Sequence, residues 1–205
     1  MFPEVDVAVY GTGMGGECLR GLCNGRCRLW IDDDPRRQGE KDGLPVYDFR
    51  GFVALKPRPN HAILAFMGGK AREAAMLKLR SHGIGMPNLV ASTAFSEDRI
   101  FEEAVIVKDF ACIGFGSRIG EGSIVDFGTV VTHHVRIGLC SHIGPGAVLC
   151  GGCSVGDRSF IGANAVVHPN VTVGADCHVE SCVVVEKDLP NGTYLSRSGV
   201  HGRTK

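Results

Sequence analysis

The second half of the chain follows a hydrophobic repeat of six residues. From Val107 to Val185 every sixth residue is aliphatic, and no insertion breaks the register. The fourteen positions are Val107, Ile113, Ile119, Val125, Val131, Ile137, Ile143, Leu149, Val155, Ile161, Val167, Val173, Val179 and Val185. A small residue often stands two positions before the aliphatic one, and a glycine often follows it.

This hexapeptide repeat predicts a parallel β-helix. Each six-residue unit would form one flat side of a triangular coil, with its aliphatic side chain stacked on those of neighbouring coils. The glycine or polar residue turns the corner, where a positive φ is often needed. With three units in each coil, fourteen units predict between four and five coils.

Residues 4–90 show a different pattern, which is typical of a small α/β unit. Val5, Val7 and Val9 alternate with other residues, as a strand requires. A helix over residues 17–24, strands over 28–31 and 61–66, and a helix over 70–81 are expected to follow. This β-α-β order predicts a parallel, Rossmann-like sheet. We therefore expect an α/β domain over residues 1–90 and a β-helix domain over 91–205.

A glycine-rich turn follows the first predicted strand. Gly11, Gly13 and Gly16 form a G-x-G-x-x-G pattern, and Asp32 and Asp33 stand about twenty residues further on. Such glycines let the backbone approach a pyrophosphate at a helix amino terminus, and the acids can bind a ribose hydroxyl or a base edge. The domain is too short for the second mononucleotide half of a dehydrogenase, so a nucleotide-sugar site is favoured. The alternative is a tight turn whose acids only cap nearby backbone.

Composition and charge exclude several classes of protein. Hydrophobic residues make up 44% of the chain, which is too many for a disordered protein. Lys+Arg and Asp+Glu both number 22, so the balanced charge predicts neither a nucleic-acid partner nor an anionic membrane surface. We expect no signal peptide and no membrane span. The nine cysteines, an odd number, favour reduced thiols and a cytoplasmic protein. Cys150 and Cys153 form a single C-x-x-C, which is weak evidence for zinc.

The motifs together resemble one family of enzymes. The segments that carry the resemblance are residues 10–16, 31–33, 65–72, 130–138, 141–147 and 183–190. They are similar to those of the NeuD/PglD-type bacterial sugar acetyltransferases, which belong to the hexapeptide-repeat acyltransferases. The resemblance implies a left-handed β-helix, a homotrimer with active sites between subunits, and acetyl-CoA as co-substrate without a metal. It also implies acetyl transfer to the amino group of a nucleotide-linked amino sugar, in bacterial surface glycan biosynthesis.

The same resemblance assigns candidate binding residues. Together with Gly11 of the turn, the residues that would line the nucleotide-sugar site are Gly13, Met14, Gly15, Asp32 and Asp33. Those that would lie along acetyl-CoA are His142, Gly151, Ala163 and Ser181, with the Gly151 amide holding the oxyanion. Asp126 stands where the family often has an asparagine that contacts the sugar.

His133 and His134 are the candidate catalytic residues. Imidazole suits a general base near neutral pH, and His133 would take a proton from the sugar nucleophile as it attacks the thioester. The family usually has an acid directly after the base, but this chain has His134 there. Asp126 could replace that acid electrostatically, or could pair with a cationic amino group of the substrate. We expect His133→Ala to lose most activity and His134→Ala to lose less.

Three other functions stay open at this point. The acceptor could be a sugar hydroxyl, as in sialic acid O-acetyltransferases. The protein could be a zinc enzyme like the γ-carbonic anhydrases, with ligands from His133, His134, His142, His168 and His178. It could also be a nucleotide-sugar-binding scaffold without catalysis, since the usual acid is absent.

Overall fold

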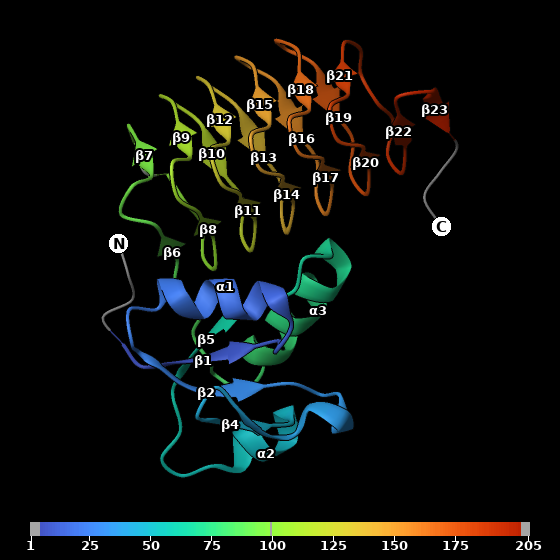
Figure 1. Ribbon diagram of the computed structural model, residues 1–205. Coiled ribbons are helices and arrows are strands. Elements are labelled where there is room, and N and C mark those ends of the chain that lie inside the picture. The colour runs from blue at the N-terminus through green and yellow to red at the C-terminus, as the bar shows by residue number, and fades with distance from the viewer. Residues whose placement is uncertain (1–4, 99, 202–205) are drawn as a thin grey trace.

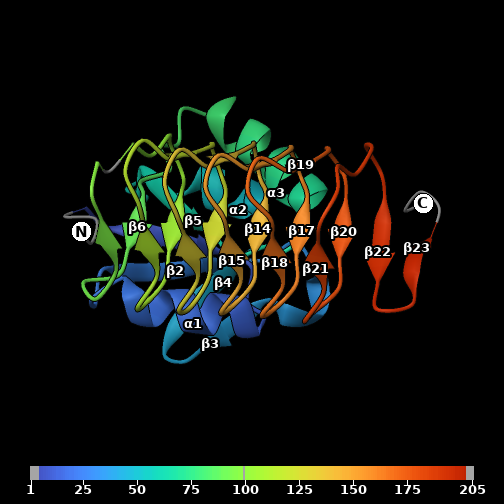
Figure 2. The same ribbon diagram turned by 90° about the horizontal axis from the view of Figure 1, so that it is seen from above.

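The protein folds into an α/β domain that packs along one side of a β-helix (Figure 1). The structure is a computed structural model, and it describes residues 5–98 and 100–201. The coils of the β-helix stack in chain order, and the last of them project beyond the α/β domain (Figure 2).

The α/β domain is built on a five-stranded sheet. Its strands are β1 (Val7–Tyr10), β2 (Cys27–Ile31), β3 (Gly39–Lys41), β4 (Leu44–Tyr47) and β5 (His61–Leu64), in the order β3-β4-β2-β1-β5. All neighbours pair in parallel except β3 and β4, which form an antiparallel hairpin. The chain builds the sheet outward from β1, first to one side through β2 and then to the other side with β5. Ligands of open parallel sheets bind at the carboxyl ends of the two strands where the order changes direction in this way.

Helices cover both faces of this sheet. They are α1 (Met14–Leu22), α2 (Phe49–Ala54) and α3 (Gly69–Arg80), with a short 3-10 helix η1 (Pro35–Arg37) after β2. The expected strands and helices are present, although α1 begins three residues earlier than the sequence indicated. The β3–β4 hairpin and α2 were not predicted.

The β-helix has three faces, each a ladder of short strands. Face 1 contains β6 (Leu89–Val90), β8 (Ile106–Val107), β11 (Ile124–Val125), β14 (His142–Ile143), β17 (Phe160–Ile161), β20 (His178–Val179), β22 (Tyr194–Ser196) and β23 (Gly199–His201). Face 2 contains β7 (Phe95–Ser96), β9 (Cys112–Ile113), β12 (Val130–Val131), β15 (Val148–Leu149), β18 (Val166–Val167) and β21 (Val184–Val185). Face 3 contains β10 (Arg118–Ile119), β13 (Arg136–Ile137), β16 (Ser154–Val155) and β19 (Thr172–Val173). Every ladder is parallel except the last pair, β22–β23.

The core of the β-helix is the predicted column of aliphatic residues. All fourteen repeat positions are buried and form one cluster. The small residue two positions before the aliphatic one also forms hydrogen bonds where it is a serine. The Ser141 hydroxyl donates to the Gly156 carbonyl (2.7 Å) and accepts from the Ser159 amide (3.1 Å), and Ser159 repeats this one coil further on. These serines therefore satisfy backbone groups inside the prism.

Face 1 also joins the two domains. Its outward residues Leu89, Ile106 and Ile124 pack with Val9 and Trp30 of the sheet. β6 already pairs with β8, so the first strand of the β-helix lies just before the expected boundary at residue 90.

The buried guanidinium of Arg72 in α3 also ties the domains together. It donates from Nε to the Gly122 carbonyl (2.7 Å) and from Nη1 to the Leu64 (2.9 Å) and Phe66 (3.0 Å) carbonyls. Burial lowers the pKa of Arg72 to about 10, still far above neutral pH, so a charged group fixes α3 on the β-helix.

Candidate active site

His133 and His134 form the turn between faces 2 and 3, which we call corner 2–3. Their Nδ1 atoms lie 3.2 Å apart, so one ring donates a hydrogen bond to the other, and both side chains are exposed. His134 has a φ of 57°, and its ring meets Phe115 edge-on at 5.7 Å. Within the described residues neither imidazole has a carboxylate at hydrogen-bond distance, so this chain itself does not supply the usual orienting acid.

Gly151 lies one coil above His133 at the same corner. A Cβ built on Gly151 would come within 2.5 Å of the His133 Nε2, so only glycine leaves room for the imidazole. The Gly151 amide has no hydrogen-bond partner among the residues that the structure describes, and it is available to an incoming oxyanion. The structure therefore places His133 and Gly151 side by side at one corner.

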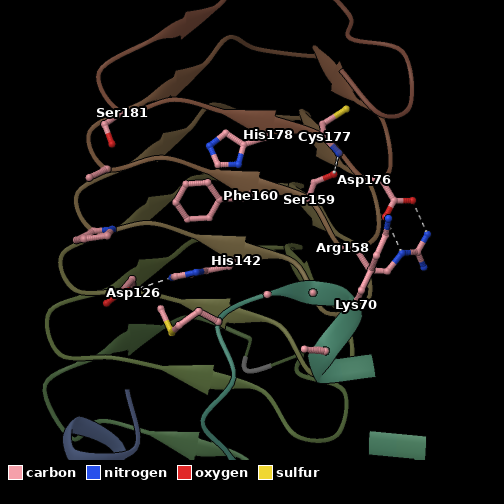
Figure 3. A pocket seen from close by; sticks show the side chains of 16 residues that line it. Lys70, Asp126, His142, Arg158, Ser159, Phe160, Asp176, Cys177, His178 and Ser181 are labelled. Carbon is pink, nitrogen blue, oxygen red and sulfur yellow. Dashed lines mark hydrogen bonds and ion pairs between the residues drawn. The ribbon is translucent and has the colours of Figure 1, made fainter. Parts of the chain in front are cut away.

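The other predicted residues of the β-helix lie in a pocket of about 840 Å³. The pocket lies between face 1 and the amino terminus of α3, and it reaches from the turn between faces 1 and 2 (corner 1–2) to the turn between faces 3 and 1 (corner 3–1) (Figure 3). Its lining includes Asp126, His142, Ala163 and Ser181, but not His133 or Gly151. Within one chain His133, His134 and Gly151 thus lie at corner 2–3, whereas the other predicted residues of the β-helix lie on face 1 and at corner 1–2.

Asp126 sits at the low end of the pocket in a buried charged cluster. Its Oδ1 accepts from Lys108 Nζ (3.0 Å) and from the Phe127 amide (2.8 Å), and its Oδ2 lies 3.0 Å from His142 Nε2. Burial alone would raise the pKa of Asp126, but the hydrogen bonds from His142, Phe127 and Lys108 outweigh it and lower the pKa to about 2. Asp126 is therefore an ionised partner of His142 and not of His133 in the same chain.

A column of rings extends upward from His142 along face 1. His142, Phe160, His178 and Tyr194 follow one another with ring centroids 4.9–5.3 Å apart. Burial lowers the pKa of His178, which favours its neutral form. This column of rings and Lys108 were not predicted from the sequence. The signal was a spacing of 18 residues, one coil, which relates 142 to 160 and 178, and 108 to 126.

Charged side chains border the pocket at corner 3–1. Arg158 binds Asp176 through two nitrogens, at 3.0 and 2.9 Å, and reaches Glu73 of α3 at 3.4 Å. Lys70, in the first turn of α3, lies 4.0 Å from Asp176. An anionic ligand entering the pocket would thus meet two cations and the first amides of α3.

The glycine turn lies at the edge of the sheet that approaches this pocket. Gly11 has a φ of 112°, and Gly13 caps α1. A Cβ on Gly15 would lie 3.6 Å from the Met67 sulfur, and Met67 lines the pocket. Met14, the first residue of α1, is 82% exposed. The turn and the pocket are therefore neighbours on one side of the molecule.

The two acids after β2 already have partners in the protein. Asp32 accepts from the Thr12 amide (3.0 Å) and hydroxyl (2.5 Å), and Arg37 lies 3.4 Å away. Asp33 accepts from the Tyr10 hydroxyl at 2.5 Å, the Lys78 ammonium at 2.9 Å and the Phe49 amide at 2.8 Å. Burial opposes these bonds, which nevertheless lower the pKa of both carboxyls. Both carboxylates thus hold the turn in shape. A ligand could use only the acceptor sites that these hydrogen bonds leave unoccupied.

No three His, Cys, Asp or Glu side chains among the described residues come together as metal ligands. No helix in the described part of the chain is long and apolar enough to cross a membrane.

Comparison with known proteins identifies the family. Residues 152–187 match the family model for the bacterial transferase hexapeptide (six repeats). A histidine-to-alanine variant of GDP-perosamine N-acetyltransferase from Caulobacter crescentus, solved with CoA and GDP-perosamine, is 30% identical; the match covers 100% of both chains with a TM-score of 0.88. The chain belongs to the hexapeptide-repeat sugar acetyltransferases. This membership confirms the predicted left-handed β-helix and the class of enzyme, an acetyl-CoA-dependent sugar acetyltransferase.

Two further solved structures share the fold. The acetyltransferase domain of PglB from Neisseria gonorrhoeae FA1090 is 25% identical over 97% of this chain and 99% of its own, with a TM-score of 0.86. WeeI from Acinetobacter baumannii AYE, at 21% identity, shares the fold over 96% of this chain and 98% of its own, with a TM-score of 0.83. A search of curated protein sequences gives no significant match. These results do not favour the carbonic-anhydrase alternative.

Proposed function

We propose that this sugar acetyltransferase moves the acetyl group of acetyl-CoA to the amino group of a nucleotide-linked amino sugar. The observation that carries the proposal is the similarity, over the whole chain, to an enzyme solved with CoA and GDP-perosamine. The same two-part architecture offers a glycine turn for the nucleotide beside a pocket for the sugar. Acetyl-CoA is a cytoplasmic metabolite, so the proposed reaction belongs to the cytoplasm.

The nucleotide end of the substrate would lie at the switch point between β1 and β5. Gly13, Met14 and Gly15 present backbone amides at the amino terminus of α1, where anions are favoured. The Gly11 amide donates to the Ile31 carbonyl at 2.7 Å, so Gly11 would shape the turn. Arg37 flanks this turn, 3.9 Å from a Cβ built on Gly13, and supplies a cation that the sequence analysis overlooked. The sugar would then pass Met67 into the pocket, with Asp32 and Asp33 holding the turn in shape.

The working enzyme would be a homotrimer, because its candidate catalytic residues lie at one edge of face 2 and its candidate binding residues lie at the other. The outward residues of that face are Phe95, Cys112, Val130, Val148, Val166 and Val184. Phe95, Val130 and Val184 are 57%, 37% and 49% exposed, which is typical of a surface covered by another subunit. If face 2 turns toward a threefold axis, corner 1–2 of each subunit meets corner 2–3 of the next.

In this arrangement acetyl-CoA would lie between subunits, against Ala163 and Ser181 of one and Gly151 of the next. His133 would accept a proton from the sugar nitrogen as it adds to the thioester carbon, while the Gly151 amide stabilises the oxyanion. The carbon–sulfur bond then breaks, and the proton passes from His133 to the departing thiolate. His134 would hold the His133 ring through the Nδ1–Nδ1 hydrogen bond.

A substrate panel tests the proposed reaction. The purified protein is incubated with acetyl-CoA and UDP-, GDP- or dTDP-linked amino sugars, and products are identified by mass spectrometry. The proposal expects one sugar to gain an acetyl group on nitrogen. Thioester hydrolysis without sugar acetylation, or acetylation of hydroxyl groups only, would overturn it.

The oligomeric state is tested by a charge on face 2. Val130→Asp is expected to convert the trimer to monomers in light scattering and to abolish activity, since each site is then incomplete. Arg136→Asp, an exposed position on face 3 of the same coil, is the matched control and should stay trimeric.

A further inference from the structure

Transfer to an amine requires the removal of two protons. An aliphatic amine is largely protonated at neutral pH, and an ammonium has no lone pair for attack. One proton must leave before attack, and a second must leave the nitrogen as the carbon–nitrogen bond forms. His133 accounts for the second proton in the mechanism above, so the first needs another acceptor.

The pocket contains an imidazole, that of His142, which a buried carboxylate orients. Because Asp126 is ionised, the 3.0 Å contact with its Oδ2 requires the hydrogen of His142 on Nε2. In the neutral form of the ring the lone pair is then on Nδ1, which has no partner among the described residues. The His142 ring lines the pocket, and its Nδ1 is not among the fully buried, unpartnered side-chain atoms of the described residues.

The side chains around this ring form a buried, charge-balanced cluster. The side chains of Asp126 and His142 are both 6% exposed, and Lys108, at 9%, neutralises the carboxylate from the other side. A carboxylate that orients a histidine also stabilises the imidazolium once a proton arrives. The titratable and charged groups that face His142 across the pocket, from every element around it, are Asp126, Lys108, His178, Lys70, Arg158 and Asp176.

Resting on the proposed function, we propose that the Asp126–His142 pair takes the first proton from the ammonium group of the amino sugar. The nitrogen–hydrogen bond breaks, its electron pair stays on nitrogen, and the proton binds Nδ1 of His142. The neutral amine then attacks acetyl-CoA, and the imidazolium releases its proton to solvent through the open pocket. The products are the N-acetylated sugar, CoA with its thiol, and one proton. His142 is thereby a catalytic residue, while Asp126 and Lys108 are positioning residues.

His142→Gln is the decisive variant. The glutamine amide can still donate to Asp126, but it cannot accept a proton. We expect kcat/KM at pH 7 to fall by about 10- to 100-fold, because only the small neutral fraction of the amine is then productive. At pH 9.5 an amine with a pKa of about 8, the value of an α-amino group, is almost wholly neutral, so the loss should shrink to less than about 3-fold. His82→Gln, at the far end of α3, is the matched control and should follow the wild-type profile.

The double variant Lys108→Met/Asp126→Asn provides a second test. It removes both buried charges together and leaves His142 without its carboxylate. An intermediate loss at pH 7 that also disappears at high pH supports the pair. An equal loss at every pH in both variants indicates a structural role only and overturns the proposal, as does an unchanged rate in His142→Gln at pH 7.

The wild-type protein separates this inference from the proposed function. If wild type acetylates no amino sugar, the proposed function fails. If wild type is active and the His142→Gln profile runs parallel to it, the reaction stands and the first-proton role of His142 is wrong.

Discussion

Replacement of Gly151 by alanine tests whether His133 must lie where the structure places it. An added Cβ would lie 2.5 Å from His133 Nε2, about 1 Å inside an ordinary contact of roughly 3.5 Å. The φ of Gly151 lies outside the positive region, so alanine causes no backbone strain there and its one conflict is with the His133 ring. The imidazole must then move by about 1 Å, and such a shift at a reacting group lowers kcat by about 10²-fold, or ~2.7 kcal/mol.

The assay is steady-state release of the CoA thiol, with unfolding by denaturant measured in parallel. His133 is exposed, so its displaced ring enters solvent and the unfolding free energy should change by less than about 1 kcal/mol. Gly21→Ala, whose added Cβ meets nothing within 4 Å, is the control. Alanine keeps the backbone N–H, so a loss of activity reports the ring and not the oxyanion donor.

A double-mutant cycle makes the test sharper. Once His133→Ala has removed the imidazole, the extra methyl at Gly151 has nothing to displace, and the double variant should be as slow as His133→Ala alone. A kcat that stays at the wild-type level in Gly151→Ala would refute this reasoning. A further 10²-fold drop in the double variant would do the same.

Three further outcomes are expected. His133→Ala should lower kcat by about 10²- to 10⁴-fold and His134→Ala by less, since the second ring acts through the first; steady-state kinetics with the reverse order would contradict the assignment. The pKa of Asp126 is lowered to about 2 in the folded chain, so its interactions add roughly 2 kcal/mol of stability above pH 4 that is lost as the pH falls toward 2. Denaturant titrations from pH 7 to pH 2 should show less acid sensitivity in Lys108→Met/Asp126→Asn than in wild type. Arg72→Met should lower the unfolding free energy by about 2–4 kcal/mol, because three buried carbonyl groups lose their donor.

The β-helix could be predicted from the sequence because the period of the repeat equals the length of one side of the coil. Six residues make one side and 18 make one coil, so residues such as Val107 and Val125 are neighbours once the register is known. The same spacing of 18 residues places Lys108 beside Asp126, so this ion pair was also predictable from the sequence. The hairpin of β3 and β4 was also readable, because Asp42 and Gly43 form a two-residue turn with positive φ.

The pocket could not be predicted in the same way. Its roof is the amino terminus of α3, and the position of that helix depends on contacts between residues far apart in sequence, such as Arg72 with Gly122 and Glu73 with Arg158. No local period encodes such contacts. The partners of Asp33 were likewise hidden, since Tyr10, Phe49 and Lys78 converge on it from three separate elements.

The shape of a β-helix explains why the histidine pair cannot be a complete site by itself. A triangular prism is convex at each corner, and side chains at a turn such as His133 and His134 point into solvent. Acyl transfer needs a concave site that orients the thioester and excludes water. Concavity arises where the α/β domain overhangs face 1, which is the pocket of His142, or where a second prism lies against the corner. Because the first place holds the sugar in our proposal and the second is bordered by apolar face 2, catalysis should need both, and dissociated subunits should bind the nucleotide sugar without acetylating it.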